Sequence, residues 1–342
     1  MLSPITTSLC RNMKRNLNEA KSSSSASTKR STMSDRSRES SSSETSPAPP
    51  QKEDADQYGS DTEGGEWTVF KTMFKKYKKR KPLPEFADVI DPRLGDPRLS
   101  IRSLEDGFVY ADASLYEKLG LRPVNEWKVA SFADRVGLYM LPGILRPDAD
   151  VEWVRRVVNY TEPPNRTNMD AHCSSPESDV LRTAGRKLRW TTLGVEYDWN
   201  TKEYPPAGRP LPDELVLFGR VISRALGIGS MTPDTTIINY YPPKSALSPH
   251  VDRSERSNAP LISLSLGQSA VYLSGGMTLD DPVLPIWLHS GDVLVMHGEQ
   301  RLVYHAIPCT KLTKKFTIKD DDFLENYLNE YRINMTIRQV NP

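Results

Sequence analysis

The sequence predicts a mainly β protein with flanking helices, of the α+β class, in which short strands form a sandwich or barrel. From residue 187 onward, short apolar segments recur and are separated by Gly, Pro and Asp. In one of them Ile262, Leu264 and Leu266 alternate with serines, a period of two typical of a strand. The predicted strands span 188–193, 235–241, 261–266, 270–273, 285–288, 293–296 and 333–340, and one helix, 211–226, interrupts them.

Residues 1–65 are predicted to be a disordered tail. Ser22–Ser46 is mostly Ser, Thr, Lys and Arg, and acidic residues follow from Glu53. This segment accounts for a hydrophobic fraction of 37%, because such a composition buries too little apolar surface to offset its chain entropy. Its basic, Ser-rich start fits a mitochondrial transit peptide and fits a plain basic tail equally well.

The segment 66–186 is predicted to be a helical and irregular extension that packs on the core domain, 187–342. Phe70, Phe74 and Tyr77 recur at helical spacing, which predicts an amphipathic helix over 67–80. The basic run 75–81 at its end is interpreted as a phosphate-binding segment, a nuclear signal or a solvated helix face. Further along, 82–135 is predicted to be irregular, 148–160 a helix and 161–186 a loop.

Composition excludes several classes of protein. Lys and Arg total 45 against 44 Asp and Glu, so a net charge of +1 gives no global indication of nucleic-acid binding. Three widely spaced cysteines exclude a disulfide scaffold and a Cys-rich zinc module, and they favour a reducing compartment. No apolar run is long enough for a transmembrane helix, so no membrane partner is expected.

A candidate metal site begins with His250-Val251-Asp252. Positions two apart on a strand face the same way, so both side chains can reach one ion. Two histidines and one carboxylate leave three coordination positions open, which suits non-haem Fe(II) and oxygen chemistry. The second histidine has three candidates downstream, namely His289, His297 and His305.

A second pattern lies near the C-terminus. Arg332, Asn334, Thr336 and Arg338 share one predicted strand face, and apolar residues occupy the other face. If the apolar face packs in the core, the arginines face solvent or an anion, and the planar arginine fork binds carboxylates in a bidentate manner. Earlier in the chain, Asn239 and Tyr241 place an amide and a phenol close to the predicted metal site.

The combination resembles the AlkB family of Fe(II)/2-oxoglutarate dioxygenases. The family pattern is N-x-Y, then H-x-D, then a histidine, then R-x-N-x-T-x-R, and here it reads Asn239-Tyr240-Tyr241, His250-Val251-Asp252, His305 and Arg332–Arg338. The resemblance covers about residues 67–340 and is closest to the AlkB homolog 1 branch. The segments that carry this are Leu188–Gly194, Tyr197–Asn200, His250–Glu255 and Asn334–Val340.

The resemblance implies a double-stranded β-helix, or jelly roll, with 187–342 as the catalytic domain. It implies that His250, Asp252 and His305 hold Fe(II), and that Arg332 binds the far carboxylate of 2-oxoglutarate. Arg338 is expected near the other carboxylate or the metal. The residues implied as further 2-oxoglutarate contacts are Asn239, Tyr240, Tyr241, Asn334 and Thr336. With O2 as cosubstrate, the products are succinate, CO2 and a hydroxylated methyl group, which leaves a nitrogen as formaldehyde.

The substrate implied by the resemblance is a methylated base in DNA and/or tRNA, unpaired or flipped out of its helix. Trp190, Tyr197 and Trp199 are expected in a nucleotide-recognition lid, where aromatic rings stack on bases, and Glu255 is expected to bond the base. The expected location is the nucleus and/or the mitochondrion, with the cytoplasm as a further candidate, and the protein is not expected to be secreted. Two other hypotheses keep the fold: a protein hydroxylase or histone demethylase, and a catalytically silent interaction module.

Overall fold

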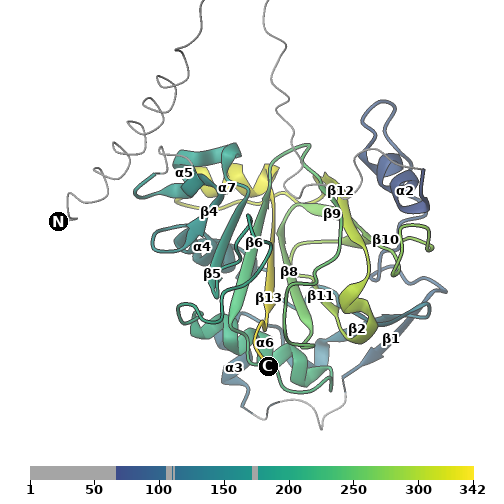
Figure 1. The fold of residues 1–342 in the computed structure, drawn as a ribbon, viewed down its shortest axis with the longest axis horizontal. Helices are drawn as coiled ribbons and strands as arrows, with labels where there is room; N and C mark the ends of the chain where they lie inside the picture. The colour runs from purple at the N-terminus through teal and green to yellow at the C-terminus, as the bar shows by residue number, and fades with distance from the viewer. Residues whose placement is uncertain (1–66, 105–109, 111, 172–175) are drawn as a thin grey trace, which may run out of the picture. The chain divides into compact units, whose positions relative to one another are not determined.

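The computed structural model describes residues 67–104, 110, 112–171 and 176–342, and the predicted tail 1–65 lies outside these residues. The described residues contain two antiparallel sheets (Figure 1). The larger has the order β1 (Leu99–Ser103), β2 (Lys128–Phe132), β3 (Arg135–Leu141), β11 (Val293–Met296), β8 (Leu261–Gly267), β13 (Arg332–Arg338), β6 (Thr235–Tyr241), β5 (Trp190–Gly194), β4 (Arg166–Thr167). The smaller has the order β10 (Leu284–Leu288), β9 (Ser269–Ser274), β12 (His305–Lys311), β7 (Leu247–His250).

The two sheets face each other across a shared core. Leu294 and Met296 of the larger sheet pack there with Tyr272, Leu288 and Ile307 of the smaller one. Two facing antiparallel sheets closed in this way form a jelly roll. The predicted fold class, mainly β with flanking helices, is confirmed.

Helices cover the outer face of the nine-stranded sheet. They are α3 (Ser114–Lys118), α4 (Ala149–Tyr160), α5 (Val180–Ala184), α6 (Asp213–Ala225) and α7 (Asp322–Glu330). Ile333, Met335 and Ile337 of β13 pack in the same cluster as Phe218 of α6 and Trp153 of α4. The intervening residues of β13 therefore face the smaller sheet, because side chains alternate along a strand.

The helix predicted over 67–80 is α2 (Val69–Lys78). The Thr68 hydroxyl caps it by accepting from the Lys71 N–H at 3.2 Å, which satisfies one of the first-turn donors. Phe70, Phe74 and Tyr77 are buried against Leu273 and the other outward-facing apolar side chains of the four-stranded sheet. The basic residues of α2 lie on its other face, so the helix is amphipathic as predicted.

The prediction of irregular structure over 82–135 was wrong, because this segment contains β1, β2 and α3. β1 is an edge strand with four of its five residues exposed, so it carries no apolar alternation to detect. Two short strands that hold site residues, β7 and β12, were also not predicted as strands, and 161–186 contains β4 and α5. The division at residue 187 stays a prediction, and the hydrogen bonds of the larger sheet join strands from both sides of it.

The predicted helices 148–160 and 211–226 correspond to α4 and α6. Among the described residues, no helix is both long enough and apolar enough to cross a bilayer.

The packing of α6 on β13 leads to a stability prediction at Gly219. A Cβ built on Gly219 would lie 2.5 Å from Pro233 Cγ and 3.3 Å from Ile337 Cγ2. Gly219→Ala is therefore expected to lower the free energy of unfolding by about 1–3 kcal/mol through overpacking, although helix propensity alone favours Ala by about 1 kcal/mol. Urea denaturation measures the difference. A variant more stable than the parent would contradict this packing.

Candidate active site

Three side chains meet between the two sheets. His250 ends β7, Asp252 follows it in the loop, and His305 begins β12, where it is the direct cross-strand partner of His250. One potential ligand atom from each lies within 4.8 Å of the others. His250 Nε2 is 3.9 Å from Asp252 Oδ1, and His305 Nε2 is 3.7 Å from Asp252 Oδ2. This spacing suits one metal ion held on one face.

Of the three downstream histidines, the structure brings only His305 to this cluster within the described part of the chain. His289 instead lies 2.7 Å from the Ser269 hydroxyl and 3.3 Å from Asp91 Oδ2. The backbone N–H of His297 donates to Gly137 at a turn between β11 and η5 (Gly298–Leu302). Cys309 packs among side chains that face α2, so it lies on the outer side of β12.

Both histidines of the cluster are oriented by the backbone. The Nδ1 atom of His250 lies 2.8 Å from the Ser248 carbonyl, and that of His305 lies 3.2 Å from the Val303 carbonyl. A carbonyl only accepts hydrogen bonds, so each Nδ1 carries the proton and each Nε2 presents its lone pair towards Asp252. Such contacts fix the tautomer that a metal ligand requires.

The protonation states also suit metal binding. Burial lowers the pKa of His305 to about 4 and lowers the pKa of His250. Burial tends to raise the pKa of Asp252, but the charge of Arg338 and its hydrogen bond to the carboxylate contribute to lowering it overall. Near neutral pH the cluster therefore holds two neutral imidazoles and one carboxylate, the forms that bind a divalent cation.

A chain of buried charges leads away from Asp252. Arg338 Nη2 lies 3.0 Å from Asp252 Oδ2, and its Nη1 lies 2.6 Å from Glu255 Oε1. Arg301, a residue of η5, is the last member of this series of charges, and its Nη2 lies 3.1 Å from Glu255 Oε2. Arg301 also donates to the Asp252 backbone carbonyl at 3.2 Å. These alternating charges fix both the carboxylate and the backbone of the predicted metal ligand.

The sequence analysis did not single out Arg301, and it placed Glu255 against the substrate base. The Glu255 side chain is 1% exposed and both of its oxygens accept from arginines. Its role in base recognition stays a prediction, while the geometry supports a structural role beside Asp252. Arg301 lies four residues before His305, outside every motif of the resemblance, which is why the motifs did not reveal it.

At the other end of the same cavity lies Arg332, which is fully buried. One of its N–H groups donates to the Ser265 hydroxyl at 3.1 Å, and its guanidinium carbon is 4.8 Å from the centre of the Tyr241 ring. Among the described residues, no partner satisfies its Nε or Nη1, and no carboxylate pairs with it. Burial lowers the pKa of Arg332. The alternative reading of this strand face as solvated was wrong.

Polar groups surround this buried cation. Asn239, Tyr241, Asn334 and Thr336 line the cavity between Arg332 and the metal cluster. The Asn334 amide donates to the Ser263 hydroxyl at 2.7 Å, and the buried Asn239 Oδ1 has no hydrogen-bond partner in the described residues. A buried guanidinium without an anion fits a bound carboxylate, because burying an unpaired charge is costly. The residues around Arg332 are therefore of the kind that would hold a carboxylate of 2-oxoglutarate.

Tyr240, which was predicted to contact the cofactor with Asn239 and Tyr241, lies on the opposite face of β6. Its side chain belongs to the cluster beneath the helices, and its hydroxyl is 3.2 Å from Thr191 Oγ1. The alternation of side chains along β6 explains this, because adjacent residues of a strand point to opposite faces. The prediction for Tyr240 is corrected accordingly.

Of the three predicted lid aromatics, only Tyr197 is among the residues that line the pocket beside the metal cluster. Tyr197 lines an entrance pocket of about 230 Å3 that His250, Asp252 and Arg338 also line. Trp199 lies between the other two rings, with centroids 4.7 Å from Trp190 and 4.9 Å from Tyr197. Tyr204, which the sequence analysis did not single out, also lines this pocket, and its ring centroid lies 4.9 Å from that of Tyr197. Substrate contact by Trp190 and Trp199 stays a prediction.

The charge chain gives a prediction for Arg301. Arg301→Gln removes one partner of a buried ion pair, so the free energy of unfolding should fall by about 3–5 kcal/mol in urea denaturation. Arg301→Lys, which keeps the charge, should lose less. Arg98→Gln serves as a matched control, because the Arg98–Asp96 pair is exposed and should contribute at most about 1 kcal/mol. If Arg301→Gln and Arg98→Gln both lower the free energy of unfolding by the same small amount, the buried chain of charges does not stabilise the fold.

Comparison with known proteins agrees with this geometry. The sequence profile of the 2OG-Fe(II) oxygenase superfamily matches residues 137–338, from β3 to the end of β13. A mouse protein named nucleic acid dioxygenase ALKBH1 is 29% identical, over 80% of this chain and 84% of its own. The tRNA demethylase abh1 of Schizosaccharomyces pombe is 29% identical, over 80% of this chain and 96% of its own. The DNA N(6)-methyladenine demethylase ALKBH1A of Arabidopsis thaliana is 27% identical with the same coverage.

The profile spans all of the cavity residues named above, including the metal cluster, Arg332 and Arg338. The relatives align along most of their own lengths, so the similarity is not confined to the metal motif. The predicted family and the predicted cofactors, Fe(II) and 2-oxoglutarate, are confirmed. The chain belongs to the 2OG-Fe(II) oxygenase superfamily and, within it, to the ALKBH1 branch of the AlkB family.

Proposed function

We propose that this protein is an Fe(II)/2-oxoglutarate-dependent dioxygenase that hydroxylates methyl groups on nucleobases of DNA and/or tRNA. N-methyl groups then leave as formaldehyde, while 2-oxoglutarate becomes succinate and CO2. The observation that carries the proposal is the buried, unneutralised Arg332 in the same cavity as the His250–Asp252–His305 cluster. A cation at this position supplies a site for a dicarboxylic acid.

Each side chain of the cavity has a defined task in this proposal. Arg332 holds the far carboxylate of 2-oxoglutarate, with Asn334 and Asn239 as neighbours that fix its orientation. Arg338 keeps Asp252 anionic and in place. When bound, Fe(II) and 2-oxoglutarate activate O2 for oxidation of a methyl C–H bond. The protein excludes bulk water from this reaction, since His305 and Arg338 are both buried.

The nucleic-acid substrate is supported by the relatives, whose names include a nucleic acid dioxygenase, a tRNA demethylase and a DNA N6-methyladenine demethylase. The entrance pocket has a volume of about 230 Å3 and is lined by Tyr197 and Tyr204, which suits one unstacked base better than a duplex. We therefore infer a flipped or unpaired base as the reacting form.

The nucleus and/or the mitochondrion is the proposed location, to be tested by imaging the tagged full-length chain.

The direct test incubates the protein with Fe(II), 2-oxoglutarate and O2 and one of three substrates: a methylated DNA oligonucleotide, a methylated tRNA or a methylated histone peptide. We expect succinate and formaldehyde in equal amounts with a nucleic acid only. Turnover confined to the peptide would identify a protein demethylase instead. No turnover together with no Mn(II) binding in anaerobic titration would indicate a silent module.

Tyr197→Ala tests base stacking at the entrance. We expect kcat/KM for the methylated oligonucleotide to fall about tenfold or more, because base–aromatic stacking contributes about 1–3 kcal/mol. The Kd for 2-oxoglutarate should stay within about twofold of the parent value. A general disruption of the cavity would instead change both this Kd and kcat/KM for the oligonucleotide. Unchanged oligonucleotide turnover would exclude Tyr197 from base recognition.

Arg332→Met tests the carboxylate site. We expect the Kd for 2-oxoglutarate in the Mn(II)-loaded protein to rise about a hundredfold or more, because one partner of a buried charge pair is lost. In the ligand-free protein the melting temperature should stay equal or rise, because an unpaired buried charge is removed. Calorimetry measures both quantities, and Arg332→Lys, which keeps the charge, is the control. Unchanged affinity for 2-oxoglutarate would refute the assignment of Arg332.

A further inference from the structure

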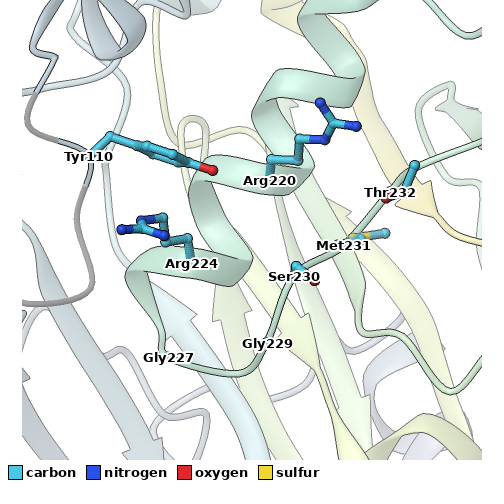
Figure 2. Close-up of a pocket in the computed structure, with 8 residues that line it drawn as sticks. All are labelled: Tyr110, Arg220, Arg224, Gly227, Gly229, Ser230, Met231 and Thr232. Atoms are coloured by element: carbon cyan, nitrogen blue, oxygen red, sulfur yellow. The ribbon is translucent and has the colours of Figure 1, made fainter.

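A second pocket lies outside the active site, at the C-terminal end of α6 (Figure 2). It has a volume of about 590 Å3 and is lined by Tyr110, two arginines of α6 and the loop that follows the helix up to Thr232. No carboxylate is among the residues that line it. Nothing in the proposed chemistry of the metal site requires this pocket.

The two arginines are Arg220 and Arg224, which lie one helical turn apart and are both exposed. Neither forms an ion pair with a carboxylate in the part of the chain that the structure describes. Like charges at this spacing on a helix oppose each other. A cation in the last turn stabilises a helix, which accounts for Arg224 but not for Arg220, four residues earlier. Bound phosphates would offset the charge of these arginines.

Tyr110 holds Arg224 in a fixed orientation. The Arg224 guanidinium carbon is 4.6 Å from the centre of the Tyr110 ring. The backbone N–H of Tyr110 donates at 2.8 Å to the hydroxyl of Tyr116, which is buried in the main core. Figure 2 shows the Tyr110 ring beside α6 with its hydroxyl towards the helix, Arg224 below the ring, and Arg220 extending away from Arg224. Stacking uses the face of the guanidinium and leaves its N–H edge for a planar or tetrahedral anion.

The pocket adjoins the end of β13 that carries Arg338. The backbone N–H of Thr232 donates to Gln339 Oε1 at 2.8 Å, and the N–H of Asp234 donates to the Arg338 carbonyl at 3.1 Å. Arg338 points to Asp252 on one face of the sheet, while Ile337 packs against α6 on the other. The pocket and the entrance therefore lie on opposite faces of the same end of the larger sheet.

We propose that Arg220 and Arg224 bind backbone phosphates of the nucleic-acid strand whose target base enters the active site. This inference rests on the proposed function and adds a contact at a distance from the reacting base. A strand that crosses this end of the sheet would pass from the entrance on one face to these two arginines on the other. Such contacts position the strand without reading its sequence.

The test measures binding of a single-stranded oligonucleotide of about 15 nucleotides with one methylated base by fluorescence anisotropy at several salt concentrations. For Arg220→Gln/Arg224→Gln we expect about tenfold weaker binding at low salt. The slope of log K against log salt should shrink by about 0.7 for each lost phosphate contact. A methylated trinucleotide, too short to span both sites, should lose much less affinity. Arg102→Gln, another exposed arginine without an ion pair, should leave the slope unchanged.

Several results would overturn the inference. One is an unchanged salt slope in the double variant while far-UV circular dichroism confirms its fold. Another is binding of inorganic phosphate or AMP that is lost in the double variant, while the affinity for the oligonucleotide is unchanged. That result would make the pocket a site for free phosphate. If the parent protein binds no oligonucleotide, the proposed function itself fails. If the parent protein and the double variant bind the oligonucleotide equally well, only the role of the pocket is rejected.

Discussion

The structure depends on how a single buried cation is held. Arg332 lies at the start of β13 in the middle of the larger sheet, where β8 and β6 pair with both of its edges. One hydroxyl and one aromatic ring contact its guanidinium, and the described residues supply no opposite charge. Burial of a charge under such conditions lowers stability. The strands around it are wholly buried, so the sheet supplies the packing that keeps this arrangement folded.

The alternation of β13 connects this cation to the rest of the molecule. Its apolar residues pack under α4 and α6, and its polar residues point to the smaller sheet, where β7 and β12 present the two histidines. One strand thus carries Arg332, the arginine proposed to bind a carboxylate, at one end and the arginine that pairs with Asp252 at the other. The separation between the dicarboxylate site and the metal site is set by the length of a strand, which does not change with side-chain motion.

The sequence allowed the prediction of elements with strong periodicity and of sites with specific motifs. β6, β11 and β13, and the helices α2, α4 and α6, match their predicted ranges closely because their burial is one-sided or continuous. Edge strands such as β1 and the short strands β7 and β12 lack enough consecutive apolar residues to be recognised. Their pairing depends on long-range contacts that no local pattern encodes.

The same limit applies to the site. His250 and Asp252 could be proposed as ligands because their residue types and spacing match a metal motif, whereas the resemblance selected His305 from three candidates and gave Arg332 its proposed role. The placement of Tyr240 on the far face follows from alternation along β6, which the motif alone does not express. Arg301 and Tyr204 reach the site from η5 and from a loop, so only the folded chain brings them to Glu255.

A guanidinium buried without a counter-charge links the concentration of its ligand to the fraction of the protein that is folded. A ligand that binds only the native state adds RT ln(1 + [L]/Kd) to its stability, and a dicarboxylate bound at Arg332, as proposed above, would be such a ligand. Scarcity of this acid would weaken the native fold as well as stop turnover. The steady-state amount of the enzyme in a cell would therefore rise and fall with the supply of its own cosubstrate, through thermodynamic linkage and protein turnover and without a dedicated sensor.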